Sequence, residues 1–240
     1  MSDLLDLVLE AHGGLDRWRR VQQVRARLDL TGPTFVALGQ GTTLVGVDVE
    51  VHVHEQCTVF AGFTGPGRRG VYTPDLVTVT EADGTVLAQR GAPRESYPLG
   101  DADAGWDALH ALYFAGYGLW NYLTTPYLLT LPGMRTEELE PSEVDGWSLR
   151  RLRVTFPPHI ATHSTEQVFY FGEDGLLRRI DYAPYVFGGR PGAHHIDAHE
   201  TVSGLVFPTH RHVRTAVGGR VGAEAIITLD LADISVAFAD

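Results

Sequence analysis

Most of the chain consists of short segments in which apolar and polar residues alternate, the pattern of half-buried β-strands. The stretch "VGVDVEVHVHE" at 45–55 shows it most clearly, with its valines from Val45 to Val53 on one side. Similar segments recur within 21–91 and 134–236, separated by Gly-containing turns such as "ADG", "GEDG" and "VSG". Such turns join neighbouring strands in antiparallel fashion. We therefore predict one long antiparallel sheet of about eleven strands.

Two helices accompany the predicted strands. The first carries apolar residues at helical spacing, namely Leu4, Leu5, Val8 and Ala11. The second runs through "WDALHALYFAGYGLWNYL" at 106–123, with Asp103 as its expected cap. Its aromatic stripe at i, i+3, i+4 spacing consists of Trp106, Leu109, His110, Tyr113, Tyr117 and Trp120. The opposite side is also apolar, so this helix is not expected to lie on the surface.

The fold class that follows is mainly β: a strongly curved, open antiparallel sheet, with an N-terminal helix and a central aromatic helical insert. The segment "TFVALGQG" at 34–41 is predicted to be one further strand. No segment repeats and no linker divides the strands into independent sets, so residues 1–240 are expected to form a single domain. Because the sheet is too long to be filled by its own side chains, we expect a concave interior with the aromatic helix as one wall. The alternative is that the helix fills the interior and leaves no cavity.

Charge and residue usage exclude several classes of function. The net charge is −11 and the basic residues are scattered, so no nucleic-acid partner is expected. All nineteen basic residues are Arg, which excludes Schiff-base chemistry and a P-loop, both of which need a lysine. The motif G-x-S-x-G is absent as well, and the Gly/Pro loop "GFTGPG" at 62–67 is expected to be a turn or flap and not a phosphate-binding loop. We therefore expect no cofactor.

The start of the chain and its single cysteine predict a cytoplasmic location. The opening "MSDLLDLVLEAHGG" has neither a basic n-region nor a continuous apolar h-region. No run approaches the ~18 apolar residues of a membrane span. Cys57 is the only cysteine, in agreement with a reducing compartment.

The order of elements resembles the lipoprotein-carrier fold of LolA-like proteins. The resemblance is clearest in "WSLRRLRVTF", "TEQVFYFGEDGLLRRIDYA" and "GLVFPTHRHV". Stretches such as "LYFAGYGLWNYLTTPYLL" are similar to a broad group of uncharacterised bacterial proteins. The fold also resembles that of the violacein-pathway enzyme VioE, a cytoplasmic, cofactor-independent catalyst acting on an aromatic intermediate. These resemblances imply a fold and a hydrophobic ligand, and they assign no catalytic residue.

Pairing the two strands around a hairpin turn at 203–204 assigns the C-terminal histidines to two faces of the sheet. The turn sets Asp197 opposite His210, and His195 opposite His212. The more apolar face, expected to lie against the core, consists of His194, Ile196, Ala198, Glu200, Val202, Leu205, Phe207, Thr209, Arg211 and Val213. The face expected to lie in water consists of His195, Asp197, His199, Thr201, Val206, Pro208, His210, His212 and Arg214.

The water-facing histidines have the spacing of metal ligands, because residues two apart on a strand point the same way. A zinc or similar ion would be bound by His195, Asp197, His199, His210 and His212. The alternative, a solvated polar face without a metal, is the interpretation that the register favours.

Polar residues near the apolar interior are the candidates for chemistry. The candidate catalytic residues are His110, His163, His194, Glu200 and Arg211, since imidazole titrates near neutrality and a buried charge needs a partner. The candidate ligand-binding residues are Trp106, Tyr113, Tyr117, Trp120, Tyr170 and Tyr182. For His110 the alternative is a core histidine bonded to a backbone carbonyl. For His163, near the rim of the sheet, it is plain exposure to solvent.

The sequence thus predicts a cytoplasmic protein that binds a hydrophobic small molecule. The first hypothesis is a cofactor-independent biosynthetic enzyme of the cyclase or isomerase type, in which histidines transfer protons on an aromatic or polyketide-like substrate. The second is a non-catalytic carrier or sensor of a lipid-like ligand. The third is a histidine-rich metal-binding protein.

Overall fold

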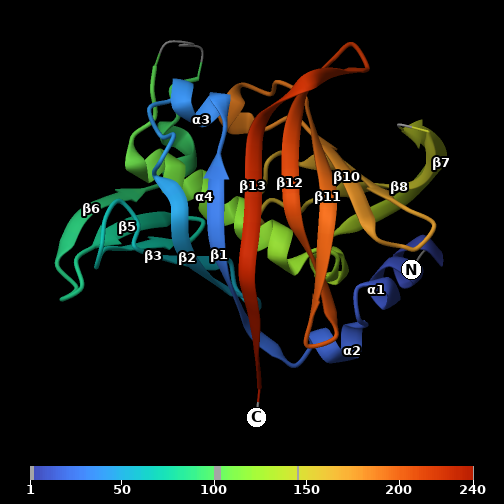
Figure 1. Ribbon diagram of the computed structural model, residues 1–240, viewed down its shortest axis with the longest axis horizontal. Helices are drawn as coiled ribbons and strands as arrows, with labels where there is room; N and C mark the ends of the chain where they lie inside the picture. The colour runs from blue at the N-terminus through green and yellow to red at the C-terminus, as the bar shows by residue number, and fades with distance from the viewer. Residues whose placement is uncertain (1–2, 100–103, 145, 240) are drawn as a thin grey trace.

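Strands are the main elements of the described chain, which comprises residues 3–99, 104–144 and 146–239 of this computed structural model (Figure 1). In chain order they are β1 (Val21–Thr31), β2 (Leu44–His52), β3 (Cys57–Ala61), β4 (Arg69–Tyr72), β5 (Leu76–Thr80), β6 (Val86–Gly91), β7 (Arg135–Val144), β8 (Trp147–Thr155), β9 (Glu166–Phe171), β10 (Leu177–Tyr182), β11 (Gly192–Val202), β12 (Leu205–Val217) and β13 (Arg220–Phe238). The helices are α1 (Asp3–Ala11), α2 (Leu15–Trp18), α3 (Pro33–Ala37) and α4 (Ala108–Thr124), with 3₁₀ turns η1 (Pro93–Ser96), η2 (Tyr127–Thr130) and η3 (Tyr185–Phe187).

Within the described residues, thirteen strands form one antiparallel sheet in the order β6-β5-β4-β3-β2-β1-β13-β12-β11-β10-β9-β8-β7. All neighbours except β1 and β13 are also neighbours in sequence, so the sheet consists of two meanders joined by its first and last strands. The turn between β11 and β12 has positive φ at Ser203 (52°) and Gly204 (77°), as a two-residue hairpin of this kind requires. The predicted open antiparallel sheet is confirmed, with two strands more than the eleven expected.

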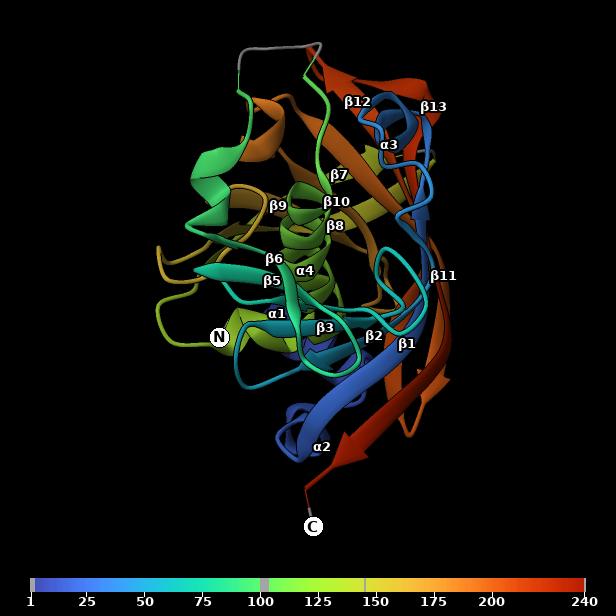
Figure 2. The ribbon, with the colours of Figure 1, turned by 90° about the vertical axis from the view of Figure 1, so that its left-hand side faces the viewer.

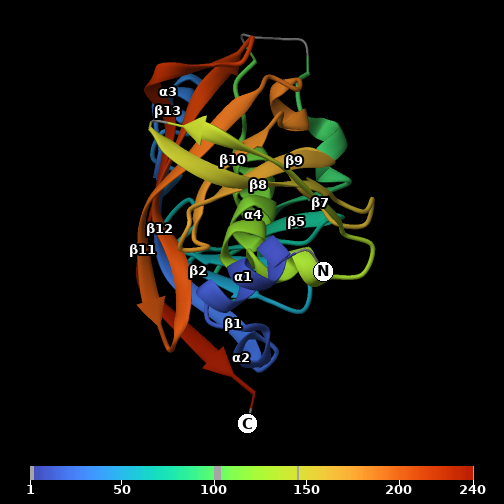
Figure 3. The same ribbon diagram turned by 90° about the vertical axis from the view of Figure 1, so that its right-hand side faces the viewer.

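The sheet bends around α4. Figures 2 and 3 show β1, β11, β12 and β13 as a long wall on one side of this helix, with the two arms of the sheet curving past it. α4 packs against β2, β3, β4 and β5, and also contacts β12. The predicted N-terminal helix and central aromatic insert are both present.

α4 is buried around almost its whole circumference. From Leu109 to Thr124 every residue except His110 is buried. This agrees with the sequence, which is apolar on both sides of the helix and offers no polar face to water. Even so, no helix in the described parts of the chain is both long and apolar enough to span a membrane.

The start of α4 differs from the prediction. The helix begins at Ala108 with Asp107 as its N-cap, and Trp106 precedes it. Asp103, the expected cap, lies outside the described residues. Asp107 takes the role because its carboxylate accepts a hydrogen bond from the backbone N–H of His110 at 3.0 Å. Trp106 is thereby placed beside the helix stripe instead of on it.

Two further local predictions are wrong. Residues 33–37 form the short helix α3 and not a strand, because Pro33 supplies the fixed φ of a first helical turn. In β2, Val45 is 45 % exposed while Leu44 is fully buried. The register of β1 and β2 shifts at this point, and Gly46 has a φ of 69°, so an extra residue reverses the alternation.

The contact between α4 and the sheet generates a stability prediction. Gly116→Ala should lower the free energy of unfolding by ~1–3 kcal/mol, because overpacking forces backbone or rings to move. A Cβ at Gly116 would lie 2.2 Å from Cγ of Tyr72. Gly118→Ala is the matched control, since its Cβ would meet nothing closer than the ring of Tyr122 at 3.7 Å.

Urea unfolding of the two variants measures the difference. Gly118→Ala should unfold at or above the midpoint of the unmodified protein, since Ala favours a helix interior over Gly by up to ~1 kcal/mol. Equal urea midpoints for the two variants would contradict direct contact between the backbone at Gly116 and the ring of Tyr72.

Candidate functional site

An apolar cleft of about 630 Å³ lies between the first half of α4 and the strands β11, β12 and β13. α3 and the η3 segment close its sides. Among the residues that line it are Leu38, Trp106, Phe114, Tyr182, Phe187, Val213 and Ile227. This volume is in the range of pockets that hold small organic ligands, ~300–1,000 Å³. The alternative in which α4 leaves no cavity is therefore wrong for this end of the helix.

Two stacked aromatic rings form one wall of the cleft. Trp106 and Phe187 lie with ring centroids 5.0 Å apart and an interplanar angle of 14°. The backbone N–H of Trp106 donates to the carbonyl of Leu38 at 2.9 Å, and the amide of Gln40 donates to the carbonyl of Trp106 at 2.5 Å. Phe187 is the last residue of η3, and Gly188, which caps η3, has the left-handed backbone conformation. The wall thus joins three segments that are far apart in the sequence.

A chain of buried hydrogen bonds lies on the inner side of the cleft. The hydroxyl of Tyr117 is 3.0 Å from Nδ1 of His163, and the hydroxyl of Tyr122 is 2.5 Å from its Nε2. The hydroxyls of Tyr122 and Tyr182 are close enough to influence one another's pKa. The Tyr182 hydroxyl is in turn 3.0 Å from Nδ1 of His194. We call these five residues the Tyr-His network.

Arg211 lies beside the Tyr-His network and is completely buried. Its guanidinium is 4.6 Å from the centre of the Tyr122 ring, and Nη2 donates to the Tyr122 carbonyl at 3.4 Å. Its Nε and Nη1 have no hydrogen-bond partner among the described residues. Burial lowers the pKa of Arg211 to about 10, so it stays a cation at neutral pH.

A small inner pocket of about 20 Å³ lies next to the cleft. It is lined by His194, Arg211 and Tyr122 on its polar side. Four residues line both spaces, namely Phe114, Tyr182, Val213 and Ile227. The cleft and the inner pocket are therefore adjacent parts of one candidate site, which is apolar at its mouth and polar at its inner end.

Burial holds the two histidines of the network neutral. Burial, together with the nearby Arg94, lowers the pKa of His163 to about 3. Burial and Arg211 hold the pKa of His194 well below its usual range. An imidazole with so low a pKa is a poor proton acceptor at neutral pH, whereas it still donates and accepts hydrogen bonds. The arrangement is suited to orienting a polar group.

The structure brings together five of the residues singled out from the sequence: Tyr117, His163, Tyr182, His194 and Arg211. Sequence reasoning missed Tyr122, which lies five positions after Tyr117 and therefore outside the i, i+3, i+4 stripe. Trp106 and Tyr182 line the cleft, whereas Tyr113, Tyr117, Trp120 and Tyr170 do not line it. Tyr113 and Trp120 are packed in the core, and the hydroxyl of Tyr170 donates to Asp181 at 2.7 Å.

His163 is not at an exposed rim, as the loop position suggested, but 1 % exposed. Its loop is fastened to the interior by side chains from other elements. The amide of Gln56 bonds both the N–H and the carbonyl of Ala161, at 2.7 and 2.9 Å. Arg94 donates to the carbonyl of Thr162 at 3.0 Å. These long-range contacts bury the loop and cannot be derived from the local sequence.

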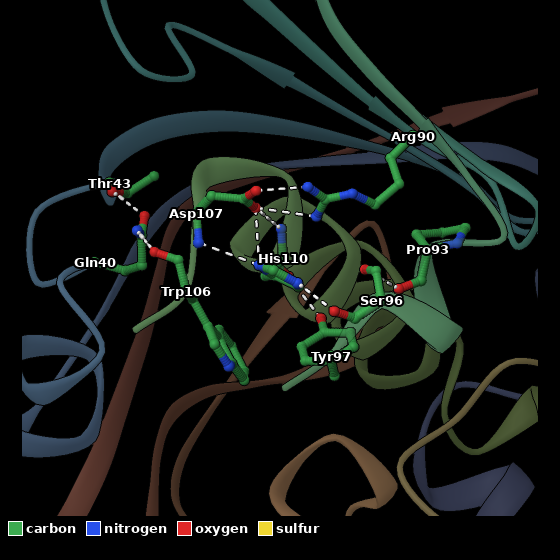
Figure 4. Close-up of polar contacts among 9 residues, drawn as sticks. All are labelled: Gln40, Thr43, Arg90, Pro93, Ser96, Tyr97, Trp106, Asp107 and His110. Atoms are coloured by element: carbon green, nitrogen blue, oxygen red, sulfur yellow. Dashed lines mark hydrogen bonds and ion pairs between the residues drawn. The ribbon is translucent and has the colours of Figure 1, made fainter. Parts of the chain in front are cut away.

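His110 has a capping role (Figure 4). Its Nδ1 accepts from the backbone N–H of Asp107 at 3.1 Å, and its Nε2 lies 3.0 Å from the carbonyl of Ser96. This agrees with the alternative of a histidine bonded to a backbone carbonyl. Arg90 binds the same Asp107 carboxylate, so the start of α4 is tied to β6 and η1. His110 lines neither the cleft nor the inner pocket.

The core-facing position predicted for Glu200 is wrong. His194 and Arg211 are buried, as predicted, whereas Glu200 is exposed. The pairing of β11 and β12 shifts locally at Ala198, so that Ala198 and not Asp197 faces His210. Glu200 keeps its expected partner Phe207 and is exposed all the same. No carboxylate in the described chain forms an ion pair with Arg211.

The outer face of the same strands carries a cluster of histidine and aspartate. Asp197, His210 and His212 have ligand atoms within 4.8 Å of one another. Nδ1 of His212 is 2.5 Å from the Asp197 carboxylate, and His210 contacts Asp230. His195 stacks on His212 at 5.0 Å, and both are only 9 % exposed, so the prediction that this face lies in water is only partly right. His199 instead contacts the carbonyl of Leu177 at 3.0 Å.

Comparisons with known proteins show the fold class. No family model and no curated protein matches the sequence. Solved structures show that the fold is LolA-like, as the sequence suggested. The likeness to VioE stays a prediction.

Three solved structures illustrate the match. A DUF1329 family protein from Desulfovibrio piger aligns with a TM-score of 0.53 and 14 % identity over 97 % of this chain and 91 % of that chain. A LolA superfamily protein from Nitrosomonas europaea aligns with 0.54 and 10 % identity over 97 % and 93 %. A putative outer membrane lipoprotein-sorting protein domain from Vibrio parahaemolyticus aligns with 0.53 and 10 % identity over 97 % and 91 %. At these identities the likeness concerns the fold alone.

The neutral buried histidines predict how stability depends on pH. An unfolded histidine takes up a proton below pH ~6.5, whereas folded His163 does so only near pH 3. The contribution of neutral His163 to the free energy of unfolding is therefore fully present above pH ~6.5. It decreases as the pH falls, by ~2 kcal/mol at pH 5. His163→Gln should flatten the fall in Tm between pH 7 and pH 5, as measured by circular dichroism.

His210→Gln provides the control of opposite sign. Hydrogen bonding to Asp230 raises the pKa of His210, so protonation of His210 adds stability as the pH falls. Its removal should leave the fall in Tm as steep as before or steeper. A His163→Gln profile parallel to that of the unmodified protein would contradict a neutral, buried His163.

Proposed function

We propose that this protein binds a hydrophobic small molecule in the cleft between α4 and the strands β11 to β13. The observation that carries the proposal is the cleft of about 630 Å³ itself, which the aromatic helix leaves open inside an otherwise filled sheet. A ligand there would replace water on aromatic and aliphatic walls, and such burial is worth roughly 25 cal/mol per Å² of apolar surface.

The likeness to a LolA superfamily protein and to a putative lipoprotein-sorting domain supports the same proposal. Their names point to lipid-linked cargo, and a curved sheet around a helix provides an apolar interior for such cargo. The pKa of His163 near 3 favours the carrier or sensor hypothesis over proton transfer. The catalytic roles expected for His110, His163, His194, Glu200 and Arg211, and the cytoplasmic location, stay predictions.

Blocking the cleft tests the proposal. Ala37 lines the cleft and is exposed, so Ala37→Trp should fill its mouth without disturbing the core. The neighbouring Val36 is 66 % exposed and does not line the cleft, which makes Val36→Trp the matched control. With the neutral dye N-phenyl-1-naphthylamine, fluorescence titration should give a Kd weakened by roughly tenfold or more for Ala37→Trp only.

Two results would count against binding in the cleft. One is the absence of saturable dye binding to the unmodified protein. The other is equal affinity in the Ala37→Trp and Val36→Trp variants, which would place the dye elsewhere.

A second candidate function is cation binding on the outer face. The specific observation is that Asp197, His210 and His212 have ligand atoms within 4.8 Å of one another. In addition, Nε2 of His212 is buried without a hydrogen-bond partner in the described chain. Two imidazoles and a carboxylate are a donor set that suits zinc.

The cation site has a direct test. After dialysis against zinc and then against metal-free buffer, the purified protein should retain about one zinc per chain by elemental mass spectrometry if the site exists. A His210→Ala, His212→Ala variant should retain none. Equal, sub-stoichiometric zinc in both proteins would remove this candidate.

A further inference from the structure

The inner end of the site contains a buried cation without a counter-ion. Arg211 is 0 % exposed, and its Nε and Nη1 have no partner among the described residues. Among the described residues no Asp or Glu forms an ion pair with it; burial lowers its pKa, and only Tyr122 and Tyr182 act in the opposite direction. A buried cation is costly unless it is paired and hydrogen-bonded. Such an arrangement requires an acceptor that the described chain does not supply.

His194 lines the same pocket and carries a third unpaired nitrogen. Its Nδ1 is engaged with Tyr182, while its Nε2 is buried without a partner among the described residues. Both His194 and Arg211 line the inner pocket. They come from paired strands, with His194 opposite Val213 and Arg211 opposite Ile196.

The hydrogen bond to Tyr182 allows Nε2 of His194 to act as a donor. When the Tyr182 hydroxyl donates to Nδ1, the neutral imidazole carries its hydrogen on Nε2. An oxygen that accepts from Nε2 favours this tautomer, because it gives the buried N–H a partner.

Three nitrogens without a partner in the described chain thus belong to residues that line the inner pocket: Nε and Nη1 of Arg211 and Nε2 of His194. The pocket of about 20 Å³ has room for one water. A water accepts hydrogen bonds but leaves the charge of Arg211 uncompensated. An anionic oxygen does both.

We propose that the ligand of the cleft is a hydrophobic carboxylic acid, whose carboxylate is bound by Arg211 and His194 while its apolar body occupies the cleft. This inference rests on the proposed function, because it assigns the chemistry of the molecule bound there. A planar carboxylate fits the paired donors of a guanidinium in two-point fashion. The narrow inner pocket suits this small group better than a bulkier phosphate. The polar head lies innermost, and the apolar body extends past Phe114 and Val213 toward Trp106.

Matched acid and alcohol ligands test the proposal. The protein is first loaded with the dye N-phenyl-1-naphthylamine at pH 8. Dodecanoic acid or dodecan-1-ol is then added at concentrations below the micellar range, and displacement of the dye is followed by fluorescence. The acid should displace the dye with an affinity roughly 10- to 100-fold above that of the alcohol. Arg211→Met, which keeps the length and removes the charge, should abolish this preference. Arg220→Met, an exposed arginine of β13, is the control and should retain it.

Stability separates a ligand-binding role of Arg211 from a structural one. Removing an unpaired buried charge should raise the Tm of the free protein, by roughly 2–4 °C or more for Arg211→Met. His194→Phe is the second variant. It keeps a ring in place, removes the Nε2 donor, and should weaken the acid several-fold without affecting the alcohol.

The outcomes distinguish the two proposals. Equal affinity of acid and alcohol for the unmodified protein would overturn the carboxylate assignment and leave hydrophobic binding intact. Loss of folding in Arg211→Met, combined with an unchanged acid preference in His194→Phe, would assign Arg211 a structural role and overturn the assignment as well. Failure of the neutral dye to bind at all would overturn both.

Discussion

The structure depends on the burial of one aromatic helix inside a curved sheet. A thirteen-stranded sheet has a concave face that its own side chains do not fill, and α4 covers it with residues that are apolar around the whole helix. At Gly116 the helix backbone approaches the Tyr72 ring directly. The same helix departs from β11 to β13 near its start, and the space left there is the cleft. The packing of α4 against the sheet and the formation of the cleft thus both follow from how the helix lies inside the sheet.

The polar groups of the interior have a common physical basis. Burial keeps His163 and His194 neutral, so that they act as hydrogen-bonding groups that link α4 to β10 and β11. Arg211 cannot be neutralised in the same way, since its pKa of about 10 leaves it charged. The Tyr-His network gives hydrogen-bond partners to its three tyrosine hydroxyls, whereas two nitrogens of the guanidinium, which lies beside the inner pocket, have none in the described chain. The unpaired charge of Arg211 is the reason that we propose an anionic group on the ligand of the apolar cleft.

Much of the fold, and part of the site, was predictable from sequence. Alternation and turn chemistry are local, so the antiparallel sheet, the terminal helix and the inward faces of His194 and Arg211 follow from them. The alternation does not predict where bulges occur, and the register shift between β1 and β2 accounts for the wrong face of Val45. The burial of His163 depends on contacts from distant elements. The cleft itself reflects the path of α4 relative to the sheet, which no local pattern encodes.

The most direct test of carboxylic-acid binding in the cleft is a crystal structure of the protein as it is purified from cells, without added ligand. We expect continuous density in the cleft, with an apolar body beside Trp106 and Phe114 and two oxygen atoms within hydrogen-bond distance of Arg211 and His194. A cleft closed by collapse of Trp106 and Phe187 against β12, with Arg211 paired to a carboxylate of its own chain, would contradict it.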